Sequence, residues 1–110
     1  MDGEEREKFA ESMINCFKDR IPIIIEKDPE SSLAQIERKK YLAPHNMTIG
    51  SFIVTIRRKI KLENYQTLFI SVKNTNFTPP SGMLMAEIYQ KYRAPDKFLY
   101  LVYRSENAFG

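Results

Sequence analysis

The stretch RIPIIIEK, from Arg20 to Lys27, decides the fold. Its run of isoleucines favours a strand, because β-branched side chains fit a pleated surface. The apolar residues are continuous rather than alternating, which indicates a strand covered on both faces. Pro22 has no backbone N–H to donate, so the strand is expected to start there. The rest of the chain must therefore supply a sheet around this strand and a cover for each face.

Three further segments have strand patterns. After the turn KDPESS, Glu37–Ala43 (ERKKYLA) predicts a short, charged strand closed by Pro44. Charge together with proline is typical of a sheet edge, where both discourage pairing with other chains. Thr67–Lys73 (TLFISVK) and Phe98–Arg104 (FLYLVYR) predict the third and fourth strands.

Three segments have helix patterns. Residues 4–19 (EEREKFAESMINCFKD) predict an amphipathic helix in which apolar side chains recur at helical spacing. Thr48 can cap a second helix that ends near Lys59. The apolar face of that helix consists of Ile49, Phe52, Ile53, Ile56 and Ile60. Its C-terminal end is basic, which suits the helix dipole. Ser81 is the candidate cap of a short third helix.

The order of these elements predicts the fold class. One helix is followed by strand, strand, helix, strand, helix and strand. A hairpin, a crossover helix and two later strands in one sheet predict an α+β protein with a ubiquitin-like β-grasp and a four-stranded mixed sheet. The N-terminal helix is an addition to that fold, and it would cover the second face of the sheet.

Composition limits the function. The 110 residues suit a single domain. No apolar run approaches the roughly 20 residues of a membrane span, and the acidic N-terminal segment does not match a signal or transit peptide. A lone cysteine, Cys16, excludes an internal disulfide and a cysteine-based metal cluster, so the cytosol or nucleus is the expected compartment.

The charge is mildly basic and unevenly distributed. The net charge is +3, and residues 18–61 hold ten basic and five acidic side chains. An acidic partner, a membrane surface or a nucleic acid could each use this excess. Nucleic-acid binding is the weaker hypothesis, because the net charge is low and no recognition motif is present. An ordinary solvated helix end also explains the basic cluster RRKIK.

The residue pattern argues against an enzyme. His45 is the only histidine and follows Pro44 in a loop, and nothing pairs it with Cys16. Cys16 is better explained as a small buried apolar residue. The sequence contains no glycine-rich phosphate loop and no metal-ligand spacing. No catalytic residue, cofactor or metal is therefore expected.

The segments KDRIPIIIEK, RKKYLAP and MTIGSF, together with a terminal Phe-Gly, resemble the GABARAP and light-chain-3 family of autophagy modifiers. The resemblance extends from about Phe9 to Gly110. It implies three parts: a helical extension over residues 1–20, a ubiquitin-like domain over 21–104 and a reactive tail over 105–110.

The resemblance implies a chemistry for the C-terminal tail. An activating enzyme would adenylate the Gly110 carboxylate with ATP and pass it to cysteine thioesters. A conjugating enzyme would then transfer it to the amine of phosphatidylethanolamine. Glycine suits this role because a residue without Cβ lets foreign active sites close around its carbonyl. Phe109 would give processing and transfer enzymes an apolar handle.

The same resemblance implies partners and locations. Gly110 would be exposed either as encoded or by a processing cysteine protease, which also reverses the conjugation. The protein would be cytoplasmic and would join the autophagosome membrane after lipidation. A frayed chain end is the plainer reading of SENAFG taken alone, because such ends are common.

The resemblance also implies a docking site for cargo-receptor peptides of the form aromatic-x-x-aliphatic. Such a peptide would add as a strand beside RKKYLAP. The first pocket would be lined by Met13, Pro22, Lys40, Leu42 and Phe98. The second pocket would be lined by Tyr41, Ala43, Pro44, Met47, Phe52 and Ile56. The acidic flank of the peptide would meet Arg20, Arg38 and Lys40.

Purely structural roles also suit several of these residues. Leu42, Phe52, Ile56 and Phe98 have the periodicity of core residues, and the basic residues of RKK could simply protect an edge. Ala43 and Thr55 are smaller than is usual in the family, which predicts a wider second pocket. The segment TNFT lengthens the loop before Pro79-Pro80 relative to family members. An unconjugated peptide-binding module and a protein-conjugated modifier of the same fold are the alternative functions.

Overall fold

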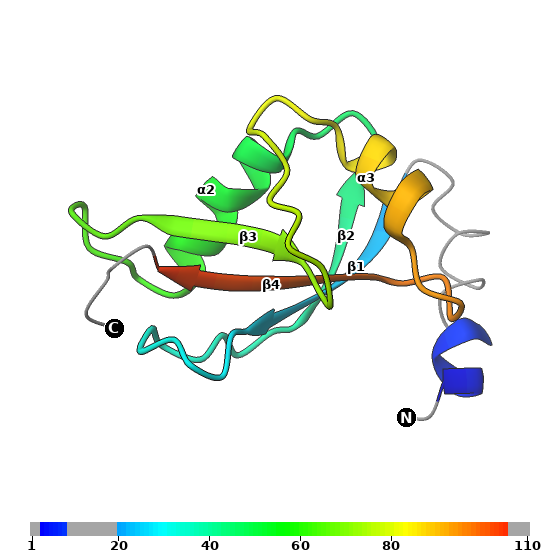
Figure 1. Ribbon diagram of the computed structural model, residues 1–110, viewed down its shortest axis with the longest axis horizontal. Helices are drawn as coiled ribbons and strands as arrows, with labels where there is room; N and C mark the ends of the chain where they lie inside the picture. The colour runs from blue at the N-terminus through cyan, green and yellow to red at the C-terminus, as the bar shows by residue number, and fades with distance from the viewer. Residues whose placement is uncertain (1–2, 9–19, 106–110) are drawn as a thin grey trace.

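The computed structural model describes residues 3–8 and 20–105 (Figure 1). The strands are β1 (Arg20–Lys27), β2 (Lys40–Pro44), β3 (Leu68–Val72) and β4 (Leu99–Ser105). The helices are α2 (Ile49–Lys59) and α3 (Met85–Tyr92), and residues 3–8 form a short helical segment beside the loop that precedes β4. The rest of the expected N-terminal helix, with Met13 and Cys16, lies outside the described residues.

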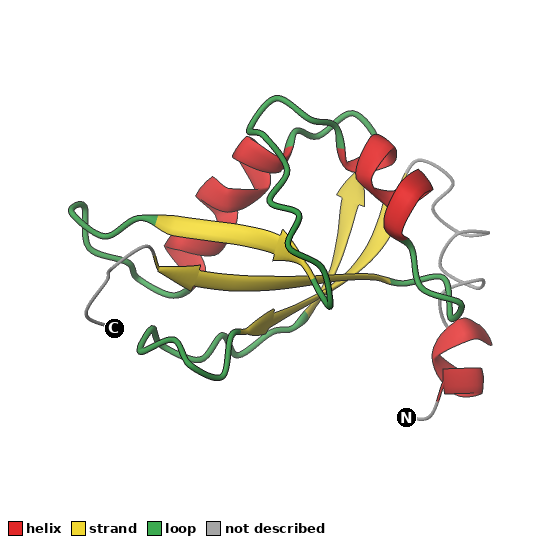
Figure 2. Cartoon of the chain, viewed as in Figure 1, coloured by secondary structure: helices red, strands yellow, loops and turns green. Residues whose placement is uncertain are grey.

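The four strands form one mixed sheet in the order β2-β1-β4-β3 (Figure 2). β1 is antiparallel to β2 and parallel to β4, and β4 is antiparallel to β3. This is the ubiquitin-like β-grasp that the element order predicts. β1 and β4 are central, whereas β2 and β3 are the two edges.

The isoleucine run of β1 is buried on both faces, as its continuous pattern predicts. Ile21, Ile23 and Ile25 join a core that also contains the apolar faces of α2 and α3. Ile24 points to the opposite face, is 5% exposed and packs against Phe98. Pro22 is the third residue of the strand rather than its first, because the two residues before it already pair with β2.

Helix α2 has the expected bounds, because its N-terminal cap is local. Thr48 Oγ1 accepts a hydrogen bond of 3.1 Å from the Ser51 N–H, and the helix continues to Lys59. The start of α3 differs from the prediction, since Leu84 rather than Ser81 precedes its first residue. The Glu87 side chain accepts from the Leu84 N–H at 3.1 Å.

A close approach between the starts of the two helices explains this difference. The Ser81 carbonyl accepts from the Gly50 N–H at 2.9 Å, and the Met83 carbonyl accepts from the Ile49 N–H at 2.9 Å. A Cβ on Gly50 would lie 3.0 Å from the Ser81 oxygen, so a glycine fits this contact. Residues 81–84 are therefore held against the start of α2 and cannot begin a helix.

The edge strand β2 starts three residues later than Glu37, its predicted first residue. Ile36 is buried, and its N–H donates to the Tyr103 hydroxyl at 2.9 Å. The same hydroxyl donates to the Ala34 carbonyl at 2.6 Å. These contacts hold the chain away from the β1 ladder until Lys39, whose carbonyl accepts from the Ile25 N–H.

Candidate functional site

The open edge of β2 presents backbone groups that can pair with another strand. In an antiparallel ladder, hydrogen-bonded and non-hydrogen-bonded pairs alternate. The Ile25 N–H donates to the Lys39 carbonyl, so Ile23 with Tyr41 and Ile21 with Ala43 continue the hydrogen-bonded series. The peptide groups of Leu42 therefore point away from β1, toward the open edge.

The outer face of the sheet brings together the described members of the expected first pocket. Pro22 and Leu42 are cross-strand partners, and Lys40 lies opposite Ile24 on the same face. Phe98 packs against Ile24 and is almost fully buried. Ile24 lies among these residues but was not expected there, although its place in a continuous apolar run indicates a strand buried on both faces. Met13 lies outside the described residues.

Five of the six residues expected in the second pocket lie on the helix side of β2, whereas strand alternation puts Pro44 on the same side as Leu42. Tyr41 and Ala43 lie opposite the core residues Ile23 and Ile21. The Tyr41 ring meets Phe52 of α2 edge-on, with 5.8 Å between ring centroids. Ala43, Phe52 and Ile56 are buried in the core, whereas Tyr41, Pro44 and Met47 are half-buried. Tyr41 and Met47 pack against the core cluster that contains the three buried residues.

The Tyr41 hydroxyl is buried and has no hydrogen-bond partner among the described residues. Burial raises the pKa of Tyr41, and the positive charge of Arg38 partly opposes this rise. The Arg38 guanidinium lies over the Tyr41 ring, 5.2 Å from its centroid, and Arg38 Nε donates to the Lys40 carbonyl at 2.9 Å. A buried hydroxyl without a hydrogen-bond partner is energetically costly.

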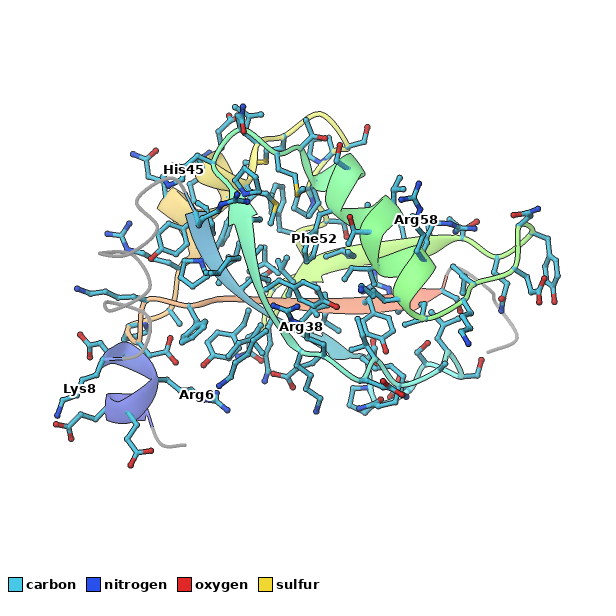
Figure 3. All side chains as sticks on the ribbon, turned by 180° about the vertical axis from the view of Figure 1, so that it is seen from behind. Arg6, Lys8, Arg38, His45, Phe52 and Arg58 are labelled. Carbon is cyan, nitrogen blue, oxygen red and sulfur yellow. The ribbon has the colours of Figure 1, made fainter. Side chains whose placement is uncertain are left out.

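The three basic residues expected to meet an acidic flank lie at two places. Arg38 and Lys40 are exposed at the start of β2, whereas Arg20 pairs with Pro44 at the other end of the ladder. Figure 3 shows Arg38 near one end of β2 and His45 just beyond the other, with Phe52 on the α2 side. Positive charge therefore brackets the edge strand.

The tail residues Phe109 and Gly110 lie outside the described residues, so their role stays a prediction. Within residues 3–8 and 20–105, no cluster of histidine, cysteine, aspartate or glutamate could hold a metal ion. In the same part of the chain, no helix has the length and apolar character needed to cross a membrane.

Comparisons with known proteins agree with this geometry. The family model described as "Autophagy protein Atg8 ubiquitin like" matches residues 5–110. Autophagy-related protein 8B of rice (Oryza sativa subsp. indica) is 42% identical over 107 residues, which cover 97% of this chain and 88% of the rice protein. Autophagy-related protein 8 of Saccharomyces cerevisiae is 41% identical over 107 residues, covering 97% and 90%.

Two solved structures are also similar. The crystal structure of Trypanosoma brucei ATG8 matches with a TM-score of 0.91 and 36% identity, covering 100% of this chain and 93% of the other. Plasmodium falciparum Atg8, in complex with a P. falciparum Atg3 peptide, matches with a TM-score of 0.83 and 30% identity, covering 96% and 94%. The family match spans nearly the whole chain, and the chain therefore belongs to the Atg8 family of autophagy-related, ubiquitin-like proteins.

Proposed function

We propose that this protein is a lipid-conjugated autophagy modifier of the GABARAP and light-chain-3 type, and that the β2 edge docks aromatic-x-x-aliphatic peptides. One observation carries the docking proposal. Apolar side chains lie on both faces of the same edge strand, with Leu42 on the outer face and Tyr41 on the helix side. Both side chains are only half-buried.

The spacing of the peptide motif fits this two-faced edge. Successive side chains of a strand point to opposite faces, so residues three positions apart point to opposite faces as well. An aromatic residue directed toward Pro22 and Leu42 would place the aliphatic residue three positions later beside Tyr41 and Met47. A peptide with one or three positions between these residues would place both on one face. The edge thus disfavours those spacings.

The basic residues at both ends of β2 support a peptide with acidic flanks. Arg20 lies at one end of the ladder, and Arg38 and Lys40 lie at the other. Complementary charge raises the rate of encounter and makes binding weaken with salt. Arg38 would release the Lys40 carbonyl when the peptide N–H groups approach the edge.

The conjugation proposal rests on family membership and on the terminal Phe-Gly. Gly110 would carry the carboxylate that is adenylated, transferred through thioesters and joined to phosphatidylethanolamine. The partners would be activating and conjugating enzymes, a processing and deconjugating cysteine protease, and cargo receptors. The protein would be cytoplasmic before lipidation and bound to the autophagosome membrane afterwards. Residues 1–20, 21–104 and 105–110 would serve as extension, ubiquitin-like domain and reactive tail.

Reconstitution tests the conjugation proposal. The protein is mixed with ATP, activating and conjugating enzymes of an Atg8 system, and liposomes that contain phosphatidylethanolamine. We expect the intact mass to rise by one lipid in the wild type and in the control Asn107→Ala, but not after deletion of Gly110. No mass gain in the wild type, from enzymes that lipidate their own modifier, would contradict conjugation. It would leave an unconjugated peptide-binding module.

A further inference from the structure

The long loop between β3 and α3 is anchored at two points that flank Thr78. Phe77 stacks on Tyr92 of α3, with 5.2 Å between ring centroids, and its carbonyl accepts from the Val72 N–H at 3.0 Å. Pro79 is buried on the other side. Thr78 itself is exposed. The segment TNFT thus holds one threonine at a fixed place on the surface.

The Thr78 hydroxyl belongs to a small polar cluster on the outer face of the sheet. Its Oγ1 lies 2.9 Å from Ser71 Oγ, and Arg104 Nη1 donates to the same Ser71 oxygen at 3.2 Å. Ser71 is 4% exposed, and its hydroxyl is the link between the other two groups. The Arg104 guanidinium and Thr78 Oγ1 therefore both lie within hydrogen-bond distance of the same atom, Ser71 Oγ.

The cluster borders an open hollow and carries the positive charge of Arg104. The hollow has a volume of about 370 Å³ and is lined by Phe69, Thr78, Arg104 and Ser105. Among the described residues, no carboxylate lies within ion-pair distance of Arg104. A guanidinium that contacts a neutral hydroxyl beside an open hollow suits an anion, and phosphate is an anion that arginine binds well.

We propose that Thr78 is a phosphorylation site whose phosphate Arg104 and Ser71 hold in place. The Thr78 oxygen attacks the terminal phosphorus of a nucleoside triphosphate, forming an O–P bond and breaking the phosphoanhydride bond. The hydroxyl proton passes to the base of the kinase, and the nucleoside diphosphate leaves. The phosphate oxygens accept charge-assisted hydrogen bonds from the Arg104 guanidinium and a hydrogen bond from the Ser71 hydroxyl.

The sequence around Thr78 indicates the class of kinase. Thr78 is followed by Pro79, and no other serine or threonine of the chain precedes a proline. A proline-directed kinase would therefore find a single site. The modification adds a charge of about −2 beside Ser105, at the end of β4. The surface of the hollow would change from positive to negative.

Phosphorylation by a proline-directed kinase with ATP tests the site. We expect the folded wild type to gain the mass of one phosphoryl group. The gain should be lost in Thr78→Val, which removes the hydroxyl at similar volume. The control Thr67→Val alters an exposed threonine without a following proline and should be modified like the wild type. An unmodified wild type, with the kinase active on a standard substrate, would overturn the proposal. The Thr78–Ser71 contact would then only hold the loop against β3.

The role of Arg104 has a separate readout. Phosphorus NMR follows the second pKa of the phosphothreonine, which is about 6 without neighbours. We expect a lower pKa in the wild type and in Arg104→Lys, because the cation favours the dianion, and a return toward the free value in Arg104→Gln. Arg104 is exposed, so these changes spare the core. The same pKa in all three proteins would show that Arg104 does not hold the phosphate.

Discussion

The two edges of the sheet differ in what covers them. At β3, the Lys73 N–H pairs with the Tyr100 carbonyl, so the Val72 peptide groups point outward, and the Phe77 carbonyl accepts from the Val72 N–H. The loop therefore caps this end of β3. At β2, the Leu42 peptide groups also point outward. Apolar side chains lie on both faces of this edge, with Leu42 on the outer face and Tyr41 on the helix side.

This difference shows how a sheet with two edges can use only one of them for strand addition. An unpaired edge is an aggregation hazard, and charge or a covering loop reduces it. The chain covers part of β3 with the loop that contains Phe77, whereas it protects β2 with Arg38, Lys39 and Lys40. The β2 protection is compatible with binding an acidic peptide. The following changes test the two edges, from the largest expected effect to the smallest.

The layer beneath the β2 edge should be most sensitive to substitution. Phe52 is 2% exposed and packs against Tyr41, so Phe52→Ala leaves a cavity and should lower the free energy of unfolding by about 3–5 kcal/mol. Denaturant unfolding measures this loss. Val54→Ala, on the same helix with a 47% exposed side chain, should change it by less than about 0.5 kcal/mol. Equal losses of unfolding free energy in the two variants would show that Phe52 does not stabilise the core.

The Tyr103 hydroxyl holds the segment that leads into β2. Tyr103→Phe removes the partner of the Ile36 N–H and of the Ala34 carbonyl. We expect the free energy of unfolding to fall by about 1–3 kcal/mol. Denaturant unfolding measures it, with the exposed Tyr65, changed to Phe, as the control. A loss no larger than that control would show that these hydrogen bonds do not fix the start of β2.

Tyr103 also predicts a pH dependence with a defined sign. Burial raises the pKa of Tyr103 above that of an unfolded tyrosine, so the unfolded chain loses the proton first. The contribution of Tyr103 to stability should therefore be constant below about pH 10 and fall as the pH rises further. The fall should be smaller in Tyr103→Phe, and burial raises the pKa values of Tyr41, Tyr89 and Tyr100 in the same direction. An identical alkaline fall in both proteins would contradict this assignment.

Matched substitutions on the two edge strands compare them directly. Leu42→Ala should weaken binding of an acidic-flanked aromatic-x-x-aliphatic peptide by about 1–2 kcal/mol, as for a central interface contact. Phe69→Ala removes an apolar side chain from β3 and should leave the affinity unchanged. Calorimetry measures both. Unchanged affinity in Leu42→Ala, or a loss shared by both variants, would contradict docking at β2.

The smallest effect is expected at the loop that caps β3. Ser71→Ala removes the buried hydroxyl that contacts Thr78 and Arg104, and should cost about 0.5–1.5 kcal/mol of unfolding free energy. Peptide affinity at β2 should not change, because Ser71 lies on the opposite edge strand. A change in affinity would show that the two edges are coupled.

The sequence predicted the features that depend on neighbours along the chain. The isoleucine run indicated that β1 is covered on both faces, and Thr48 with its apolar repeat gave the bounds of α2. Charge and proline identified β2 as an edge. These predictions are confirmed because periodicity, helix caps and edge protection depend on residues that are close together in the sequence. The members of the two pockets could be named only through the family resemblance.

Contacts between distant residues decided what the sequence could not show. Hydrogen bonds from Tyr103 to Ala34 and Ile36 set the start of β2, and contacts of residues 81–83 with the start of α2 delayed α3. The division of the docking residues between two faces of β2 follows from the register of the ladder. The cluster of Ser71, Thr78 and Arg104 exists only in the folded chain. The sequence by itself determined which elements form. The tertiary structure decided where they end and which side chains meet, because those outcomes depend on contacts between segments far apart in the chain.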